Sequence, residues 1–145
     1  MKTYKYYIGI DCGVKTGYAV YDRTKKQLIE ICSKTIVAAM FEVRNIAMNN
    51  PGEVMVRVED ARQRKWIPAG KNEKAERGRN RGAGSVMRDA QIWEEFLSGE
   101  DLFFEMVAPK NNRTKLNADV FKRITGYAGM TSEHGRDAAM LVFGL

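Results

Sequence analysis

The chain has 145 residues, of which 44% are apolar and 29% charged, a balance typical of a folded globular chain rather than a disordered or membrane-embedded one. The length suits a single domain, and no stretch approaches the ~18 apolar residues of a membrane span. Lysine and arginine number 24 against 18 aspartates and glutamates, and the resulting net charge of +6 favours a polyanionic partner such as nucleic acid.

The first part of the chain predicts strands joined by tight connections, followed by one helix. In order, we expect strands over 4–12, 16–22 and 27–33, a helix over 36–48 and a fourth strand over 53–59. The three consecutive strands predict an antiparallel meander, and Asn49-Asn50-Pro51-Gly52 ends the helix. No signal peptide precedes the first strand, and the cysteines Cys12 and Cys32 are too few for a disulfide framework. Both features point to the reducing cytoplasm.

The second part opens with a basic segment, residues 60–81, which shows almost no periodicity and which we interpret as a long functional loop. After it we expect a helix over 84–98, a fifth strand over 102–108, a partly helical stretch around 118–124 and a last helix over 132–144. The order βββαβαβα predicts a mixed five-stranded sheet of the α/β class, with helices on both faces. All of it forms one domain, residues 1–145.

Two acids are predicted at strand ends. Side chains alternate along a strand, so Asp11 shares a face with Tyr7 and Gly9, opposite Ile8 and Ile10. Glu59 ends the fourth strand, and if the two strands are parallel neighbours the two acids lie side by side. Taken alone, Asp11 is better explained as a turn residue, and Glu59 as a solvated or ion-paired side chain.

The last helix adds two more candidates, His134 and Asp137, which are three residues apart and therefore on one face. A lone histidine there is more often structural than functional. The first strand, the fourth strand and the last helix are expected to converge on one sheet face, which would bring their acids together. Clustered carboxylates repel one another unless a cation neutralises them, so this convergence favours a functional role over a structural one. Oxygen ligands of this kind suit Mg²⁺ or Mn²⁺.

Three segments together resemble the RuvC family of RNase H-like nucleases. They are IGIDCGVKTGYAVYD at 8–22, VRVED at 56–60 and EHGRDAAML at 133–141. The family has an acid in the first strand, a Glu ending the fourth strand and H-x-x-D or D-x-x-D on the last helix, and Asp11, Glu59, His134 and Asp137 match these positions. The resemblance covers nearly the whole chain and implies an RNase H-like fold.

The resemblance also implies a function: a metal-dependent endonuclease of branched DNA, and specifically a Holliday junction resolvase acting in recombination and repair. Asp11 would bridge two divalent ions, Mg²⁺ or Mn²⁺, and Glu59 and Asp137 would each complete one coordination sphere. His134 would either ligate an ion or position the attacking water. Lys115 or Lys122 would sit against the scissile phosphate, although a solvated surface lysine explains either one as well.

The basic segment is expected to supply phosphate contacts, each adding affinity that falls with salt. The residues assigned to nucleic-acid binding there are Arg62, Arg64, Lys65, Trp66, Arg77, Arg79 and Arg81. Arg62 stands where junction resolvases often carry an aromatic wedge, which leaves the preferred DNA structure open. Trp66 either stacks on a base or packs beneath the segment.

Other readings remain. A YqgF-like RNA-processing nuclease has the same fold, as would a non-catalytic nucleic-acid-binding module, whereas an actin-like ATPase needs two such domains and more residues.

Resolving a two-fold symmetric junction takes two nicks, so we expect a homodimer. The helix over 84–98 is its candidate interface, since its large apolar groups, among them Trp93 and Leu97, exceed what one core-facing stripe needs. Their burial in the chain's own core is the alternative.

Overall fold

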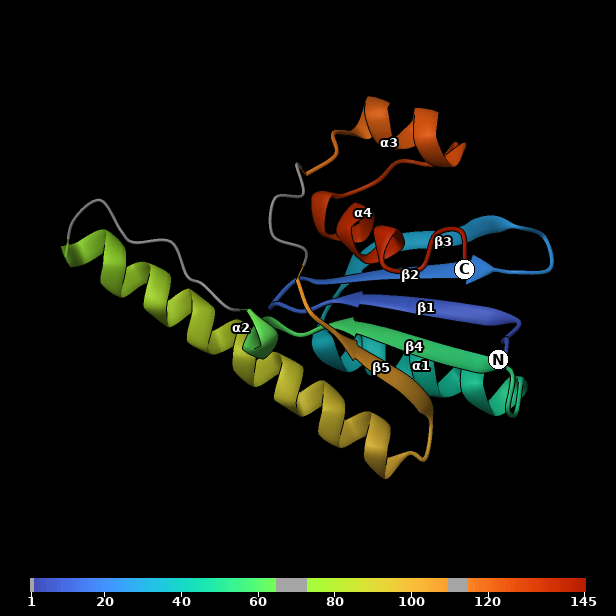
Figure 1. The fold of residues 1–145 in the computed structure, drawn as a ribbon, viewed down its shortest axis with the longest axis horizontal. Helices are drawn as coiled ribbons and strands as arrows, with labels where there is room; N and C mark the ends of the chain where they lie inside the picture. The colour runs from blue at the N-terminus through green and yellow to red at the C-terminus, as the bar shows by residue number, and fades with distance from the viewer. Residues whose placement is uncertain (1, 65–72, 110–114) are drawn as a thin grey trace.

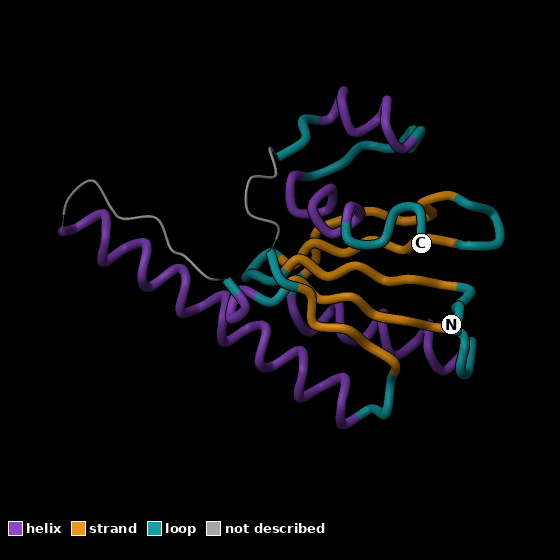
Figure 2. Tube along the Cα trace, in the orientation of Figure 1, coloured by secondary structure: helices purple, strands orange, loops and turns teal. Residues whose placement is uncertain are grey.

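The computed structural model describes residues 2–64, 73–109 and 115–145, which form a mixed sheet covered by helices (Figures 1 and 2). The strands are β1 (Tyr6–Asp11), β2 (Thr16–Asp22), β3 (Gln27–Lys34), β4 (Val54–Glu59) and β5 (Phe103–Val107). The helices are α1 (Ile36–Asn49), α2 (Glu73–Gly99), α3 (Ala118–Thr125) and α4 (Glu133–Met140), with a short 3₁₀ helix, η1 (Ala61–Gln63), after β4.

The sheet has the strand order β3-β2-β1-β4-β5. β1 pairs antiparallel with β2, and β2 pairs antiparallel with β3, which is the predicted meander. β4 lies parallel to β1 on its other side, and β5 lies parallel to β4. Ile10 is opposite Val58, so the next residues, Asp11 and Glu59, end neighbouring parallel strands at one edge of the sheet. The predicted fold class is confirmed.

The alternation of side chains along the strands produces two cores. Ile8, Ile10 and the valines of β4 pack on one face, against α1 and α2. Tyr7, Ala19 and Tyr21 pack on the other face, against α4 and α3. In Figure 1, α1 and α2 lie below the sheet and α4 and α3 above it. Asp11 shares the face of Tyr7, so it points toward α4, as the sequence predicts.

The interpretation of residues 60–81 as one loop is wrong. Residues 61–63 form η1, and residues 73–81 belong to α2, which begins eleven positions before the predicted start at Gly84. The segment 73–81 lacks apolar periodicity because it projects past the sheet (Figure 1), and its Glu, Lys, Ala and Arg residues favour helix without core contacts. Lys65, Trp66 and Lys71 lie outside the described residues. No described helix is long and apolar enough to cross a membrane.

The last helix is shorter than predicted. α4 ends at Met140, and residues 141–144 continue as turns rather than as helix. The amides of Leu141 and Val142 bond carbonyls three residues back, which tightens the chain, and Gly144 has a φ of 84°. The carbonyl of Leu141 accepts a hydrogen bond from the guanidinium of Arg57 in β4 at 2.6 Å.

Candidate active site

Three side chains from opposite ends of the sequence meet where β1 ends. One ligand atom from each of Asp11, His134 and Asp137 lies within 4.8 Å of the other two. Nδ1 of His134 is 3.1 Å from Oδ2 of Asp11, across 123 positions of sequence. The tertiary fold therefore assembles three of the four predicted site residues into one cluster.

Asp11 is held at the end of a central strand. It pairs with Gly17 of β2, and its side chain is 16% exposed. The turn between the strands is closed by fully buried Thr16, whose hydroxyl donates to the carbonyl of Gly13 at 3.0 Å. A carboxylate at this position has a rigid backbone and one open side, the arrangement that a fixed ligand needs.

α4 approaches the sheet closely because two strand residues lack a Cβ. An ideal Cβ on Gly17 would lie 2.0 Å from the carbonyl oxygen of His134, and one on Gly9 would lie 2.0 Å from that of Ala138. Both distances are far below van der Waals contact, so no other residue fits at either place without moving α4. The two glycines set the height of α4 above β1 and β2, and hence the distance of His134 from Asp11.

The N-terminus of α4 is anchored to the edge strand. The hydroxyl of Ser132 caps the helix by accepting from the amide of Gly135 at 3.0 Å. It also lies 2.7 Å from the hydroxyl of Ser33 in β3. Together with the bond from Arg57 to the Leu141 carbonyl, these contacts hold α4 at both ends.

Glu59, the fourth predicted residue, lies beside the cluster but is not a member of it. Burial raises the pKa of its carboxyl, and the charges of Asp11 and Asp137 raise it further. That influence places Glu59 in the same electrostatic neighbourhood, on the neighbouring strand, as predicted. The guanidinium of Arg64 and the ammonium of Lys115 partly oppose the shift.

The cluster is a site of excess negative charge. Burial raises the pKa of Asp11, and the Asp137 carboxylate adds to the rise, while the hydrogen bond from His134 opposes it. A carboxylate can only accept, so Nδ1 of His134 carries a proton when that bond is made. Nε2 is then the ring nitrogen that remains for a ligand or a proton.

Lys115 is the cation nearest to this cluster for which the structure describes contacts. Its Nζ donates to Glu133 at 2.7 Å and lies 3.7 Å from Asp137. The hydrogen bond to Glu133 raises the pKa of Lys115. Sequence reasoning selected Lys115 but missed Glu133, whose only signal was its position in the first turn of α4, one residue before His134.

Arg62, predicted to contact nucleic acid, is instead bound within the chain. Its guanidinium donates to buried Asp60 at 2.8 and 2.9 Å and to Glu94 of α2 at 3.2 Å. These hydrogen bonds hold the pKa of Asp60 below its usual range. Arg62 therefore fixes η1 and the end of β4 against α2, and Asp60 is a structural acid that sequence reasoning missed.

Four of the other predicted cations lie on the surface. Arg64 follows η1, Arg77 and Arg81 lie on α2, and Lys122 lies on α3, all of them exposed. Arg79 also falls in α2. Trp93 and Leu97, offered as dimer interface, are fully buried in the chain's own core, so the alternative holds for these two.

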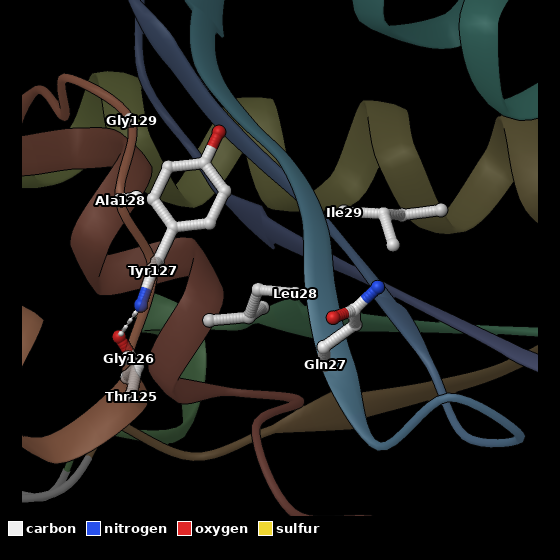
Figure 3. Close-up of a pocket in the computed structure, with 8 residues that line it drawn as sticks. All are labelled: Gln27, Leu28, Ile29, Thr125, Gly126, Tyr127, Ala128 and Gly129. Atoms are coloured by element: carbon white, nitrogen blue, oxygen red, sulfur yellow. Dashed lines mark hydrogen bonds between the residues drawn. The ribbon is translucent and has the colours of Figure 1, made fainter.

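A separate pocket lies at the other end of the sheet. It is lined by Gln27, Leu28 and Ile29 of β3 and by residues 125–129 between α3 and α4 (Figure 3). Gln27 begins β3 and pairs with Asp22, the last residue of β2. Asp11 pairs with Gly17 near the start of β2, and Gly17 pairs with Ser33 near the end of β3, so the site lies at the opposite end of these strands. No acid or cation lines this pocket, so it offers no chemistry related to the cluster.

The donor set fits a divalent cation. Ligand atoms of two carboxylates and an imidazole lie within 4.8 Å of one another, and the charges of two of these carboxylates, Asp11 and Asp137, act on a third, Glu59. Hard oxygen donors with an available imidazole suit Mg²⁺ or Mn²⁺. A bound cation would also offset the burial and the repulsion that together raise the pKa values of Asp11 and Glu59.

The fold and the cluster define an α/β chain with an RNase H-like architecture. Its structure is similar to a solved structure described as "T. thermophilus RuvC in complex with Holliday junction substrate". The TM-score is 0.57 at 12% sequence identity, over 95% of this chain and 90% of that one. At this identity the likeness shows the fold alone. No protein-family model matches the sequence, and no curated protein matches it.

Proposed function

We propose that this chain is a divalent-metal-dependent endonuclease of branched DNA, with the four-way junction as its preferred substrate. The observation that carries the proposal is the meeting of Asp11, His134 and Asp137 within 4.8 Å, on a fold similar to that of RuvC. The net charge of +6 supports a polyanionic substrate.

Each residue has a distinct part in this proposal. Asp11, Glu59 and Asp137 hold two Mg²⁺ or Mn²⁺ ions, which supply Lewis acidity for phosphodiester hydrolysis when bound. Asp11 would be the central ligand, because β1 neighbours β4, which ends at Glu59, and contacts α4, which carries Asp137. His134, oriented by its Nδ1–H bond to Asp11, presents Nε2 to an ion or to the attacking water. Lys115 offers an ammonium to the scissile phosphate.

A symmetric junction requires two nicks, and this chain presents one such cluster among its described residues. The proposal therefore includes a homodimer, in which two-fold symmetry supplies the second site. Sedimentation of the protein bound to a junction tests that part separately: one protomer per junction, with paired nicks still produced, would remove it.

The test is cleavage of labelled four-way junctions, Y-forks, linear duplexes and RNA of matched sequence, with Mg²⁺ or Mn²⁺. We expect junction cleavage by the wild type and a loss of about 10³-fold or more for Asp11→Asn, with binding preserved in EDTA. Glu59→Gln and Asp137→Asn should act alike. Binding without cleavage of any substrate would favour a non-catalytic module, and cleavage of RNA alone would favour an RNA-processing enzyme.

A further inference from the structure

The part of α2 that projects beyond the sheet carries a row of cations on one face. Lys74, Arg77, Arg81 and Arg88 are spaced by three, four and seven residues, and all four are exposed. At 3.6 residues per turn these positions fall within an arc of about 60°. We call these four residues the α2 basic stripe.

The stripe faces away from the body of the chain. Ala90, Trp93 and Leu97, which are fully buried against the sheet, lie roughly 160° around the helix from its centre. The stripe contributes nothing to the described core, so its cations are available to a partner. Arg88 lies 14 positions after Lys74, which corresponds to a length of about 21 Å along the helix.

The stripe lies at the end of the molecule that carries the candidate site. β1 and β4 both end there, and α2 contacts η1, which begins two residues after Glu59. In Figure 1 the first turns of α2 extend outward from this end of the sheet, past the arrowheads of β1 and β4. A polyanion along the stripe therefore lies at the end of the molecule where cleavage is proposed, although α2 and α4 cover opposite faces of the sheet.

We propose that the α2 basic stripe binds the phosphate backbone of a double-stranded DNA arm; this rests on the proposed function and extends it to a second contact surface. Over about 21 Å a duplex carries on the order of a dozen phosphates, enough for every cation of the stripe. The sequence from Lys74 to Arg88 contains no aromatic residue, whereas surfaces for single strands rely on stacking rings. Contacts of the stripe with phosphates depend on the charge of the DNA backbone and not on the base sequence.

The test removes the four charges together, as Lys74→Gln, Arg77→Gln, Arg81→Gln and Arg88→Gln, since glutamine keeps helix propensity high. Binding of a labelled linear duplex, a four-way junction and a single strand is measured by anisotropy in EDTA over a range of salt. We expect the log–log salt slope on duplex and junction to fall by about 3–4 units, at 0.9 per lost phosphate contact.

A matched control removes four charges at the opposite end of the sheet, as Lys5→Gln, Arg23→Gln, Lys25→Gln and Lys26→Gln. The control should keep the wild-type slope, because these cations flank the start of β1 and the β2–β3 turn. An equal fall of the salt slope in both variants would show that the affinity depends on overall charge, and would overturn the proposal that the stripe binds DNA. A loss confined to the single strand would overturn the duplex assignment.

A second variant guards against a loss of helix. Arg77→Lys, Arg81→Lys and Arg88→Lys preserve every charge and should preserve the slope; a fall as large as in the glutamine variant would overturn the proposal. An unchanged slope in the glutamine variant, with cleavage intact in the wild type, would reject the stripe and leave the nuclease standing. If binding depends on the stripe but the wild type cleaves no substrate, the stripe stands and the proposed nuclease activity is rejected.

Discussion

The site at the end of β1 and the projecting half of α2 are built in opposite ways. Asp11, His134 and Asp137 are placed by tight packing of α4 on β1 and β2, with backbone atoms in near contact at Gly9 and Gly17. The cations of the stripe stand on a helix surface with no described packing against the sheet. Chemistry at a phosphate requires atoms fixed to a fraction of an ångström, whereas affinity for a phosphate backbone requires only charge at the right spacing. Variants that alter packing should therefore affect the first region and spare the second.

Among variants that alter packing, the largest effect is expected from Gly17→Ala. The new Cβ would meet the carbonyl oxygen of His134 at 2.0 Å, so α4 must shift and carry His134 and Asp137 away from Asp11. We expect a loss of about 100-fold in cleavage and a destabilisation of about 1–3 kcal/mol. Titration of Mn²⁺ into the protein without DNA should also show weaker metal binding. Wild-type metal affinity in this variant would show that α4 is not held by close approach at Gly17.

A smaller effect is expected from Arg57→Met, which keeps the apolar stem and removes the donor to the Leu141 carbonyl. Loss of this hydrogen bond at the end of α4 should lower the free energy of unfolding by about 1–2 kcal/mol, measured by urea denaturation. The control is Glu105→Gln, which removes the exposed ion-pair partner of Arg57 and should change stability little. Equal losses in the two variants would contradict the assigned role of the Leu141 bond.

The opposite sign is expected for Gly82→Ala and Gly84→Ala in α2. Nothing lies within 4 Å of an ideal Cβ at either position, so alanine meets no obstacle there. Each substitution should stabilise the helix by up to about 1 kcal/mol, because alanine loses less backbone entropy than glycine in a helix. Circular dichroism should show equal or higher helicity, with nucleic-acid binding retained. A fall in helicity would contradict a continuous helix through these positions.

The smallest effect concerns the metal-free protein. The pKa of Asp11 is raised on folding, so its ionised form disfavours the folded state. Its contribution to stability therefore falls as pH rises from the unfolded-state value through the higher folded-state value. Asp11→Asn should remove that fall and raise the melting temperature in EDTA at pH 7 by a few degrees. Adding Mg²⁺ should stabilise the wild type and not the variant. A lower melting temperature for Asp11→Asn in EDTA would show that its bond to His134 outweighs the repulsion.

Much of the site was predictable because strand and helix periods are local. Alternation placed Asp11 on the face opposite Ile8, and helical spacing placed His134 beside Asp137; the structure has both arrangements. The fold class followed from the order of the elements. The start of α2 was not predictable in this way, because a projecting helix needs no apolar period, and the charged run 73–81 looks the same in a loop and in a solvated helix.

What the sequence determined by itself was the identity and order of the parts: five strands, the helices, acids at the ends of two strands, a histidine and an acid on the last helix, and an excess of cations. Only the tertiary structure decided which of them meet. It brought α4 onto Gly9 and Gly17, left Glu59 beside the cluster, bound Arg62 to Asp60 and Glu94, and aligned four cations along α2. The physical reason is that periodicity fixes the direction of a side chain relative to its own element, whereas the distance between two elements depends on the packing of every residue between them.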